Sequence, residues 1–396
     1  MQLEEIREER LSKSTIVFAL YLFLLPLDFI NIGLGSVSKL LSFLVVGVTL
    51  LGDIKRMNFS FGLISIMALY ICWNCFSLFY SGNVSNTLER IISLSLNYMM
   101  IIVCGSISRN ERELKFLEKA IVLSGWFVLV LMLFFSRVTS EFRVIIVSGG
   151  QAQDPNYLCG FLMYPIVYYF KNIFNRQKRV SSIVSFVLMI IFVLLTGSRG
   201  GLIAVIGACI CCYLLNNSNK NKIQGFIISA LILVFVYMII MAIMPEELLA
   251  RFDLSYTEED RGAGRFDIWQ SLLEQYADFG FVRHFAGVGA AAIRVYSRKV
   301  AHNLWIETLF ELGIIGLVLI ILMYIAFGKR AWRSKEKICF SVLIGYIIMS
   351  LSMSLGVFKP IYVIFTMINL NFKFETEQEM ELLEDEENAL QGDCCE

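Results

Sequence analysis

Thr196-Gly197-Ser198-Arg199-Gly200-Gly201 interrupts an apolar stretch that runs from residue 181 to residue 215. A single helix of that length would span about 50 Å, whereas the hydrocarbon core of a bilayer is about 30 Å thick. An arginine near the bilayer centre costs about 3 kcal/mol or more. The stretch therefore predicts either one tilted helix or two shorter helices joined at the glycines. In both cases Arg199 is expected to meet water, a protein partner or an anionic ligand.

The composition of the whole chain excludes a soluble domain, because 57% of its residues are hydrophobic and only 17% are charged. We expect an all-α polytopic membrane protein with about twelve transmembrane helices. The first segment follows a polar start and is long enough to remain as an anchor, so no cleavable signal peptide is expected. Ten cysteines lie mostly in or beside apolar segments and are predicted to be packing residues. The twelve segments are 14–34, 36–51, 60–80, 89–106, 116–136, 157–174, 181–196, 200–215, 224–244, 303–328, 337–355 and 357–371.

Basic residues in the connecting loops decide the orientation. With the N-terminus inside, most Lys and Arg residues of the short loops face the cytoplasm. If 181–215 were one helix, the basic cluster at 329–337 would lie outside, so the charge bias favours two helices with Arg199 at an extracytoplasmic hairpin. The long loop 245–301 lies on the same side. The basic residues left outside in short loops are Lys39, Arg90, Arg137, Arg143, Arg199 and Lys359.

The chain is predicted to form one transmembrane domain over 1–374, followed by an acidic cytoplasmic tail over 375–396 that is solvated or disordered. Within the loop 245–301, Arg265 opens an amphipathic stretch that ends near Tyr276. We expect an interfacial helix there, with Trp269 at headgroup level. Arg265 itself could be a solvated helix-start residue paired with Asp267 or Glu258.

His302 and Asn303 stand just before the apolar run that starts at residue 304. A histidine at this place is commonly a capping or interfacial residue. The alternative is a general base, because the ordinary pKa of histidine lies near neutrality.

Glu307 and Glu311 are spaced i, i+4 in the same predicted span. Carboxylates there are costly unless they face a cavity or a cation. Arg199 and Arg265 are the candidate partners.

Asp154-Pro155-Asn156 is typical of a helix start, with a side-chain cap before a proline in the first turn. Asn156 could also contribute hydrogen bonds to a polar cavity. Two arginines on one side of the membrane suit a diphosphate, because guanidinium groups match phosphate oxygens and stay charged. We see no cluster of metal-ligand spacing on that side, so arginine would have to stabilise a diphosphate leaving group.

At these residues the chain resembles the O-antigen ligase and polymerase superfamily of bacterial envelope glycosyltransferases. The resemblance covers about residues 150–325, and the order and spacing of the motifs carry it. The matching pieces are Asp154-Pro155-Asn156, Thr196-Gly197-Ser198-Arg199-Gly200-Gly201, Gly264-Arg265-Phe266-Asp267-Ile268-Trp269, Gly287-Val288-Gly289, Ala301-His302-Asn303-Leu304-Trp305 and Glu311-Leu312-Gly313-Ile314-Ile315-Gly316.

The resemblance implies an all-helical, type C glycosyltransferase-like fold in the bacterial cytoplasmic (inner) membrane, with the site facing the periplasm or exterior. Arg199 and Arg265 would bind the diphosphate of an undecaprenyl-diphosphate-linked glycan, without a metal or another cofactor. His302 would activate the acceptor hydroxyl for an inverting transfer. Asn156, Asn303 and Glu307 are further candidates for the site.

Polymerase and ligase share these motifs. A polymerase adds lipid-linked repeat units to one another to make O-antigen, capsule or exopolysaccharide, and a ligase transfers the glycan to lipid A core during lipopolysaccharide synthesis. We favour the polymerase, with membrane lipid and a chain-length regulator as further partners and no nucleic acid. A lipid-linked glycan flippase or transporter, and a non-catalytic scaffold, are the alternatives from other classes; few ionisable residues lie within the spans and no repeated halves are evident.

Overall fold

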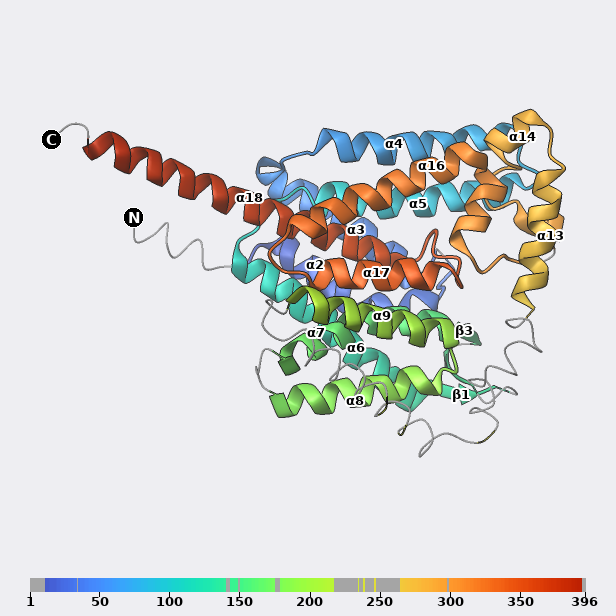
Figure 1. Cartoon of the computed structure of the whole chain (residues 1–396), viewed down its shortest axis with the longest axis horizontal. Helices are drawn as coiled ribbons and strands as arrows, with labels where there is room; N and C mark the ends of the chain where they lie inside the picture. The colour runs from blue at the N-terminus through green and yellow to red at the C-terminus, as the bar shows by residue number, and fades with distance from the viewer. Residues whose placement is uncertain are drawn as a thin grey trace.

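The computed structural model describes residues 11–33, 35–139, 143–148, 150–174, 179–216, 264–297 and 299–393, together with residues 234, 238 and 246. Most of these residues form a bundle of helices that run alongside one another (Figure 1). The bundle helices are α2 (Lys13–Leu24), α3 (Val37–Asp53), α4 (Phe61–Phe76), α5 (Val84–Cys104), α6 (Glu111–Phe135), α7 (Pro155–Phe174), α8 (Arg179–Leu195), α9 (Arg199–Asn216), α16 (Leu304–Arg333), α17 (Ile338–Ser350) and α18 (Lys359–Asp393).

The helices confirm the prediction of an all-α membrane protein with many spans. Within the described residues, six helices are long and apolar enough to cross a membrane, and α8 and α17 are shorter apolar helices. Each predicted segment except 224–244 corresponds to a bundle helix. The segment 224–244 lies outside the described residues, apart from residues 234 and 238.

The apolar stretch 181–215 forms two helices, as the loop charges predicted. Helix α8 ends at Leu195 and α9 begins at Arg199. Helix α8 packs mainly on α7, whereas α9 packs on both α17 and α7, and the two helices hardly contact each other. The turn that joins them lies at the end of the bundle marked by β1 and β3 in Figure 1. We call this end of the bundle, which also holds α13 and α14, the capped end.

Short helices cover the capped end. They are α13 (Arg265–Ala277), α14 (Phe281–Ala286) and α15 (Ile293–Ser297). Figure 1 shows α13 lying across the ends of the bundle helices, which agrees with the predicted helix at 265–276. The half-buried indole of its Trp269 packs against a small second core around Leu272 and Phe310, and its Nε1 donates to the Ala301 carbonyl at 2.7 Å. The position of Trp269 at headgroup level stays a prediction.

Helix α16 is broken at Gly313, where the backbone takes φ 66° and ψ −167°. The break frees carbonyl groups of the preceding turn, which would otherwise be bonded within the helix. The backbone N–H of Val288 donates to the Phe310 carbonyl (3.2 Å), and that of Gly289 to the Glu311 carbonyl (2.8 Å). The predicted single span 303–328 is therefore a short outer helix and a longer inner one, and the outer one is bound to the loop after α14.

The capped end also contains a small antiparallel sheet that the sequence analysis did not predict. Its strands are β1 (Ser136–Val138), β2 (Val144–Ser148) and β3 (Gln151–Gln153), in the order β1-β2-β3. The register pairs Val138 with Val144 and Ile146 with Gln153. The β-branched run Val144-Ile145-Ile146-Val147 was the available signal, since such residues favour strands.

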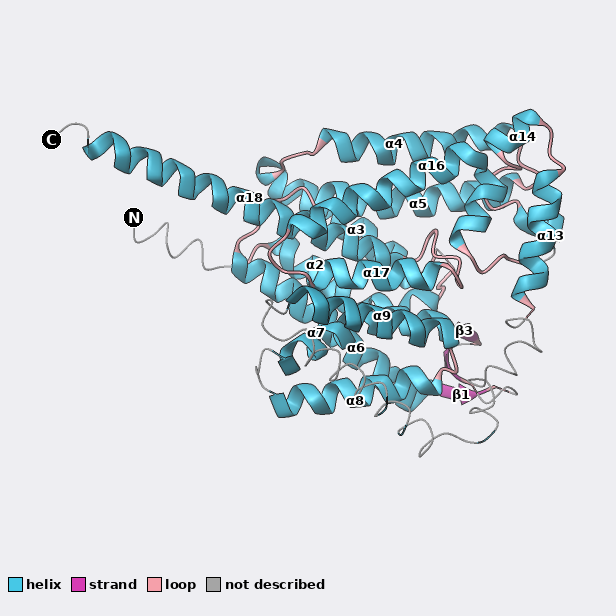
Figure 2. Cartoon of the chain, viewed as in Figure 1, coloured by secondary structure: helices cyan, strands magenta, loops and turns pink. Residues whose placement is uncertain are grey.

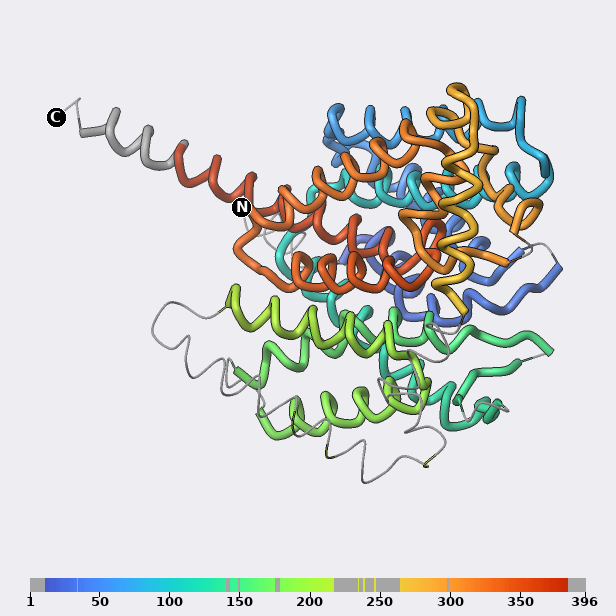
Figure 3. The backbone as a smooth tube through the Cα atoms, turned by 45° about the vertical axis from the view of Figure 1, so that its right-hand side comes forward, coloured from blue at the N-terminus to red at the C-terminus, as the bar shows by residue number. Residues whose placement is uncertain are grey.

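The C-terminal residues differ from the predicted disordered tail. Helix α18 continues without interruption to Asp393 and extends past the other helices (Figure 3). Glu, Gln, Met and Leu dominate this part, and all of them are good helix formers. The carboxylate of Glu375 also accepts hydrogen bonds from the Ser334 hydroxyl and the Lys335 backbone, at 2.9 Å each, which ties the helix to the α16–α17 connection. Figure 2 shows the remaining connections as short loops at the two ends of the bundle.

Gly313→Ala is expected to destabilise the protein. A side chain costs about 1–2 kcal/mol in the left-handed region, and a Cβ at this position would also overlap the backbone of Phe285. Gly328→Ala in the same helix is the matched control, since a Cβ there meets no atom within 4 Å. Thermal unfolding of the purified variants in detergent measures both effects. Equal stability of the two variants would contradict the role of the break.

Candidate functional site

The turn between α8 and α9 has a conformation and contacts that require most of the small residues in Thr196-Gly197-Ser198-Arg199-Gly200-Gly201. Gly197 takes φ 61° after the last turn of α8, a conformation in which glycine has no steric cost. The Ser198 hydroxyl accepts from the Gly201 backbone at 3.1 Å and so caps the start of α9. These local contacts explain the small residues but not the guanidinium of Arg199, which begins α9 half-buried.

Gly200 and Gly201 allow close packing at the start of α9. A Cβ on Gly200 would overlap the Ser352 hydroxyl, and one on Gly201 would overlap the thiol of Cys159 in α7. The first turn of α9 therefore lies directly against the connection between α17 and α18. Both the backbone N–H groups and Arg199 favour an anion at this helix start.

A second arginine, Arg143, joins this turn to the start of α7. Its Nε donates to the Thr196 carbonyl (2.9 Å) and its Nη2 to the Asn156 side-chain oxygen (2.9 Å). Asp154 caps α7, because its carboxylate accepts from the backbone N–H and the side-chain amide of Asn156. The predicted helix start at 154–156 is thus confirmed. The sequence analysis had counted Arg143 only as a loop charge.

His302 lies in the loop that leads into α16, and its backbone takes φ 49°. This conformation is uncommon for a residue with a side chain, and such outliers concentrate at functional sites. The next residue, Asn303, is the N-cap of α16, because its side-chain oxygen accepts from the backbone of Trp305 and Ile306 at 3.0 and 3.1 Å. The Asn303 amide donates to the Leu351 carbonyl at 3.0 Å. Asn303 therefore positions the His302 loop.

The connection between α17 and α18, residues 351–358, links the candidate residues to one another. Ser352 meets Gly200 of α9, as described above, and Leu351 accepts from Asn303. The Ser354 hydroxyl donates to the carboxylate of Glu307, and the Ser354 carbonyl accepts from the Tyr157 hydroxyl of α7 at 3.0 Å. The starts of α7, α9 and α16 thus meet around one short segment.

Charged groups surround the His302 imidazole. Burial lowers its pKa below the ordinary 6.5, and the nearby Arg265 guanidinium lowers it further. Asp154 and Glu307 act in the opposite direction, and Arg294 adds a smaller lowering effect. The shifts show that Arg265, at the start of α13, and Asp154, beside the α8–α9 turn, both lie within electrostatic reach of His302. A neutral imidazole beside cationic groups can accept a proton near neutral pH.

The cation that faces Glu307 and Glu311 is Arg90 of α5. Its guanidinium lies 3.0 Å from the Glu307 carboxylate and 3.8 Å from that of Glu311. The prediction that Arg199 or Arg265 would serve as this partner was wrong, because α5 brings its own arginine to the same depth. The Glu311 carboxylate also accepts from the Ile293 backbone at 3.2 Å, which holds the loop before α15.

A small cavity of about 260 Å³ adjoins this ion cluster at the capped end. It lies between α5, α15 and the outer part of α16, and we call it the outer cavity. Its polar lining consists of Asn86, Glu89, Arg90, Ser93, Arg294, Glu307 and Glu311.

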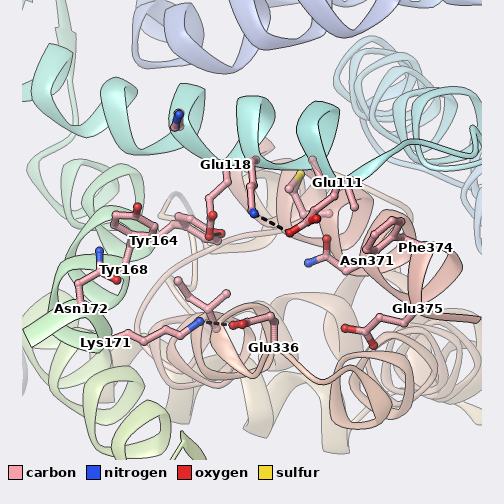
Figure 4. Close-up of a pocket in the computed structure, with 15 residues that line it drawn as sticks. Glu111, Glu118, Tyr164, Tyr168, Lys171, Asn172, Glu336, Asn371, Phe374 and Glu375 are labelled. Atoms are coloured by element: carbon pink, nitrogen blue, oxygen red, sulfur yellow. Dashed lines mark hydrogen bonds and ion pairs between the residues drawn. The ribbon is translucent and has the colours of Figure 1, made fainter. Parts of the chain in front are cut away.

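A larger cavity of about 400 Å³ lies at the opposite end of the bundle, between α6, α7, α17 and α18. Figure 4 shows Glu118 and Tyr164 on one side of it and the Lys171–Glu336 ion pair on the other. None of the predicted site residues lines this cavity. Among the described residues, no group of three or more His, Cys, Asp or Glu side chains could hold a metal ion.

The structure therefore gathers the predicted residues at the capped end, on several elements. Asn303 and Glu307 contact the 351–358 segment directly, and Asn156, Arg199 and His302 are sequence neighbours of residues that contact it or pack on it. Arg265, at the start of α13, lies within electrostatic reach of His302. Sequence reasoning missed Arg90, Arg143 and the serines of that segment. Arg90 and Arg143 stood out only as two of the few basic residues in the outer loops, and the serines gave no signal at all.

Comparison with known proteins agrees with the motif resemblance. Residues 184–321 match the family described as O-antigen ligase. This match includes Arg199, Arg265, His302 and Glu307, and it confirms the resemblance of this part of the chain to the O-antigen ligase and polymerase superfamily. The fold and the match together define a multi-span membrane protein with a region similar to the family described as O-antigen ligase, which supports a part in the polymerisation or ligation of glycans at a membrane. Comparison with the curated proteins gives no match.

Two solved structures are similar over most of their length. One is a chain from a study of polymerisation and crosslinking by a peptidoglycan synthase complex, with 14% identity, a TM-score of 0.49, and coverage of 80% of this chain and 98% of that one. The other is the rod shape determining protein RodA of Thermus thermophilus, with 12% identity, a TM-score of 0.42, and coverage of 80% and 97%. Similarity at this level does not extend to function.

Replacing Arg90 should destabilise the protein strongly. The Glu307 and Glu311 side chains are only 5% and 2% exposed, and Arg90→Met removes the cation that pairs with them. Breaking such a buried ion pair costs about 3–5 kcal/mol. Lys39→Met is the control, since Lys39 pairs with a Glu89 side chain that is 74% exposed and such pairs contribute about 0–1 kcal/mol. Thermal unfolding in detergent compares the two, and adding Glu307→Gln and Glu311→Gln to Arg90→Met should recover part of the loss. A similar effect of both single variants would argue against the cluster.

Proposed function

We propose that the protein is a membrane glycosyltransferase that transfers a glycan from undecaprenyl diphosphate to an acceptor hydroxyl. The observation that supports the proposal is the location of Arg199, Arg265 and His302 at the capped end (Figure 1), within the region that matches the family described as O-antigen ligase. The products would be surface polysaccharides, made in the bacterial cytoplasmic membrane with the capped end facing the exterior. Labelling of an Arg199→Cys variant by a membrane-impermeant reagent from the outside tests this orientation.

Arg199 and Arg265 would bind the diphosphate of the donor. Each contributes a permanent positive charge at the start of a helix, where the peptide dipoles add to the attraction for an anion. In the transition state, negative charge develops on the leaving diphosphate, and preorganised guanidinium groups stabilise it without a metal. The packing of Gly200 and Gly201 holds the first turn of α9, and hence Arg199, in place.

His302 would act as the general base. The acceptor oxygen forms a bond to the anomeric carbon while its proton moves to the neutral imidazole. The bond between the anomeric carbon and the diphosphate oxygen breaks, and the diphosphate leaves with the bonding electrons. Attack from the face opposite to the leaving group inverts the configuration. Asn303 and Glu307 position the loop, and Asn156 holds Arg143, so we assign these residues supporting roles.

Arg199→Ala, Arg265→Ala and His302→Ala should each lower glycosyl transfer by at least about 100-fold, as expected for loss of charge stabilisation or of a general base. Incubation of purified protein with lipid-linked repeat units, with and without EDTA, measures this, and the activity of the wild-type protein should survive EDTA. Lys115→Ala is a suitable control, because this side chain is 64% exposed and lies at the opposite end of the bundle. Transfer near the wild-type rate in any of the three variants would remove that residue from the mechanism.

The same incubation distinguishes the two forms of the function. A ladder of products from lipid-linked repeat units alone identifies a polymerase, which we favour. Transfer only after lipid A core is added identifies a ligase, which the description of the matching family supports. If the purified protein moves the lipid-linked glycan across vesicles without forming a new bond, it is a flippase and the proposal is wrong.

The rate of transfer should depend on the protonation of His302. Its pKa lies below 6.5, so the imidazole stays neutral as the pH falls to 6.5, and activity should be lost only below that value, as the base becomes protonated. Arg294→Gln removes a cation that lowers the pKa of His302. The fall in transfer rate at low pH, the acid limb of the pH–rate profile, should therefore begin at a higher pH in this variant. A pH–rate profile of both proteins measures the limb. An acid limb above pH 6.5 in the wild-type protein would exclude His302 as the base.

A further inference from the structure

The outer cavity is lined by hydrogen-bonding groups that the proposed diphosphate site does not use. The first half of α5 contributes four polar residues to the lining, which are Asn86, Glu89, Arg90 and Ser93. Glu307 and Glu311 of α16 line the other side. The carboxylates accept hydrogen bonds, whereas the amide of Asn86 and the hydroxyl of Ser93 both donate and accept them. The α5 side of the cavity lies outside the matched region 184–321, and its α15 and α16 sides lie inside that region.

The charges of the cavity favour a neutral ligand. Arg90 is neutralised by Glu307 and Glu311, and Glu89 pairs with Lys39 at 3.7 Å. The two arginines of the lining, Arg90 and Arg294, face three carboxylates, so the lining has no excess of positive charge to attract a phosphate. The polar lining disfavours a lipid chain. The volume of about 260 Å³ is just below the range of about 300–1,000 Å³ found for drug-sized ligands, so a single ring fits better than an oligosaccharide. A neutral sugar ring with several hydroxyls has this size and chemistry.

The outer cavity adjoins the loop that carries His302. Val300 of its lining stands two residues before His302, and Glu307 of its lining lies in the first turn of α16, which follows that loop. Glu307 and Arg294 of the lining also act on the pKa of His302. The cavity therefore lies next to the His302 loop.

We infer that the outer cavity between α5, α15 and α16 is the subsite for the acceptor sugar, which places the attacking hydroxyl of a neutral ring beside His302. The inference rests on the proposed function. An inverting transfer needs the acceptor and the leaving diphosphate on opposite sides of the anomeric carbon, and a base within reach of the attacking hydroxyl. The outer cavity is walled by α5, whereas Arg199 begins α9, which packs on α17 and α7, so the cavity and this arginine lie on different elements. Ser93 of α5 lines the cavity, so the size of the side chain at this position limits the space for the sugar ring.

The test compares two neighbouring residues of α5. Ser93→Phe fills the outer cavity, whereas Ile92→Phe alters a side chain that is 48% exposed on the outer surface of the bundle and does not line the cavity. With lipid-linked repeat units extracted from the cells that produce them, and lipid A core added in parallel, we expect Ser93→Phe to lower transfer at least about 10-fold and Ile92→Phe to lower it less than about 2-fold.

A binding measurement keeps the test independent of folding and turnover. In the His302→Ala background, Ser93→Cys and Ile92→Cys are labelled with a water-soluble maleimide and followed by mass spectrometry of the peptide. The lipid-linked repeat unit, or lipid A core where that is the acceptor, should slow labelling at position 93 and leave position 92 unchanged. This arm still decides the question if Ser93→Phe fails to fold.

The outcomes separate the two proposals. Transfer by the wild-type protein together with unchanged Ser93→Phe activity, or unprotected labelling at position 93, overturns the subsite and leaves the proposed function standing. Absence of transfer by the wild-type protein with either acceptor overturns the proposed function and the subsite with it. Loss of transfer in Ser93→Phe, combined with protection at position 93 alone, supports the acceptor subsite.

Discussion

A largely buried guanidinium, that of Arg90, lies between two carboxylates of α16, and the capped end of the protein depends on this cluster. One cation joins α5 to the outer part of α16, and Glu311 extends the contact to the loop before α15. Buried charges are tolerated only when paired and hydrogen-bonded, so these elements can take only positions that keep the cluster closed. Glu307, which Arg90 holds, is also bonded to Ser354, and the His302 loop therefore rests on the same cluster.

The break in helix α16 also contributes to the structure of the capped end. Gly313 releases carbonyl groups that the loop at Val288 and Gly289 then satisfies, so the outer turn of α16 becomes part of the cap instead of part of a straight span. The backbone bonds hold the short helices over the bundle, and the small core around Leu272 and Phe310 closes them against water. A water-restricted, rigid cap strengthens the electrostatic interactions of the arginines and the histidine beneath it.

Two ends of the bundle carry different chemistry. The capped end combines Arg199, Arg265 and His302 with the outer cavity, whereas the opposite end holds a larger cavity that contains none of these groups. The capped end is also where helix starts converge, since the beginnings of α7, α9 and α16 meet at residues 351–358 and helix starts attract anions.

The sequence by itself determined the spans, the split of 181–215 into two helices and the helix that starts at Arg265, because these depend on local hydrophobicity, charge and turn residues. It also placed Arg199 and His302 in functional motifs. Only the tertiary structure decided that Arg90, and not Arg199 or Arg265, neutralises Glu307 and Glu311, that the Trp269 indole donates to the Ala301 carbonyl, and that serines between α17 and α18 join the site. Such pairings link residues far apart in the chain, and nothing in local pattern or composition specifies which distant charge fills a given buried position.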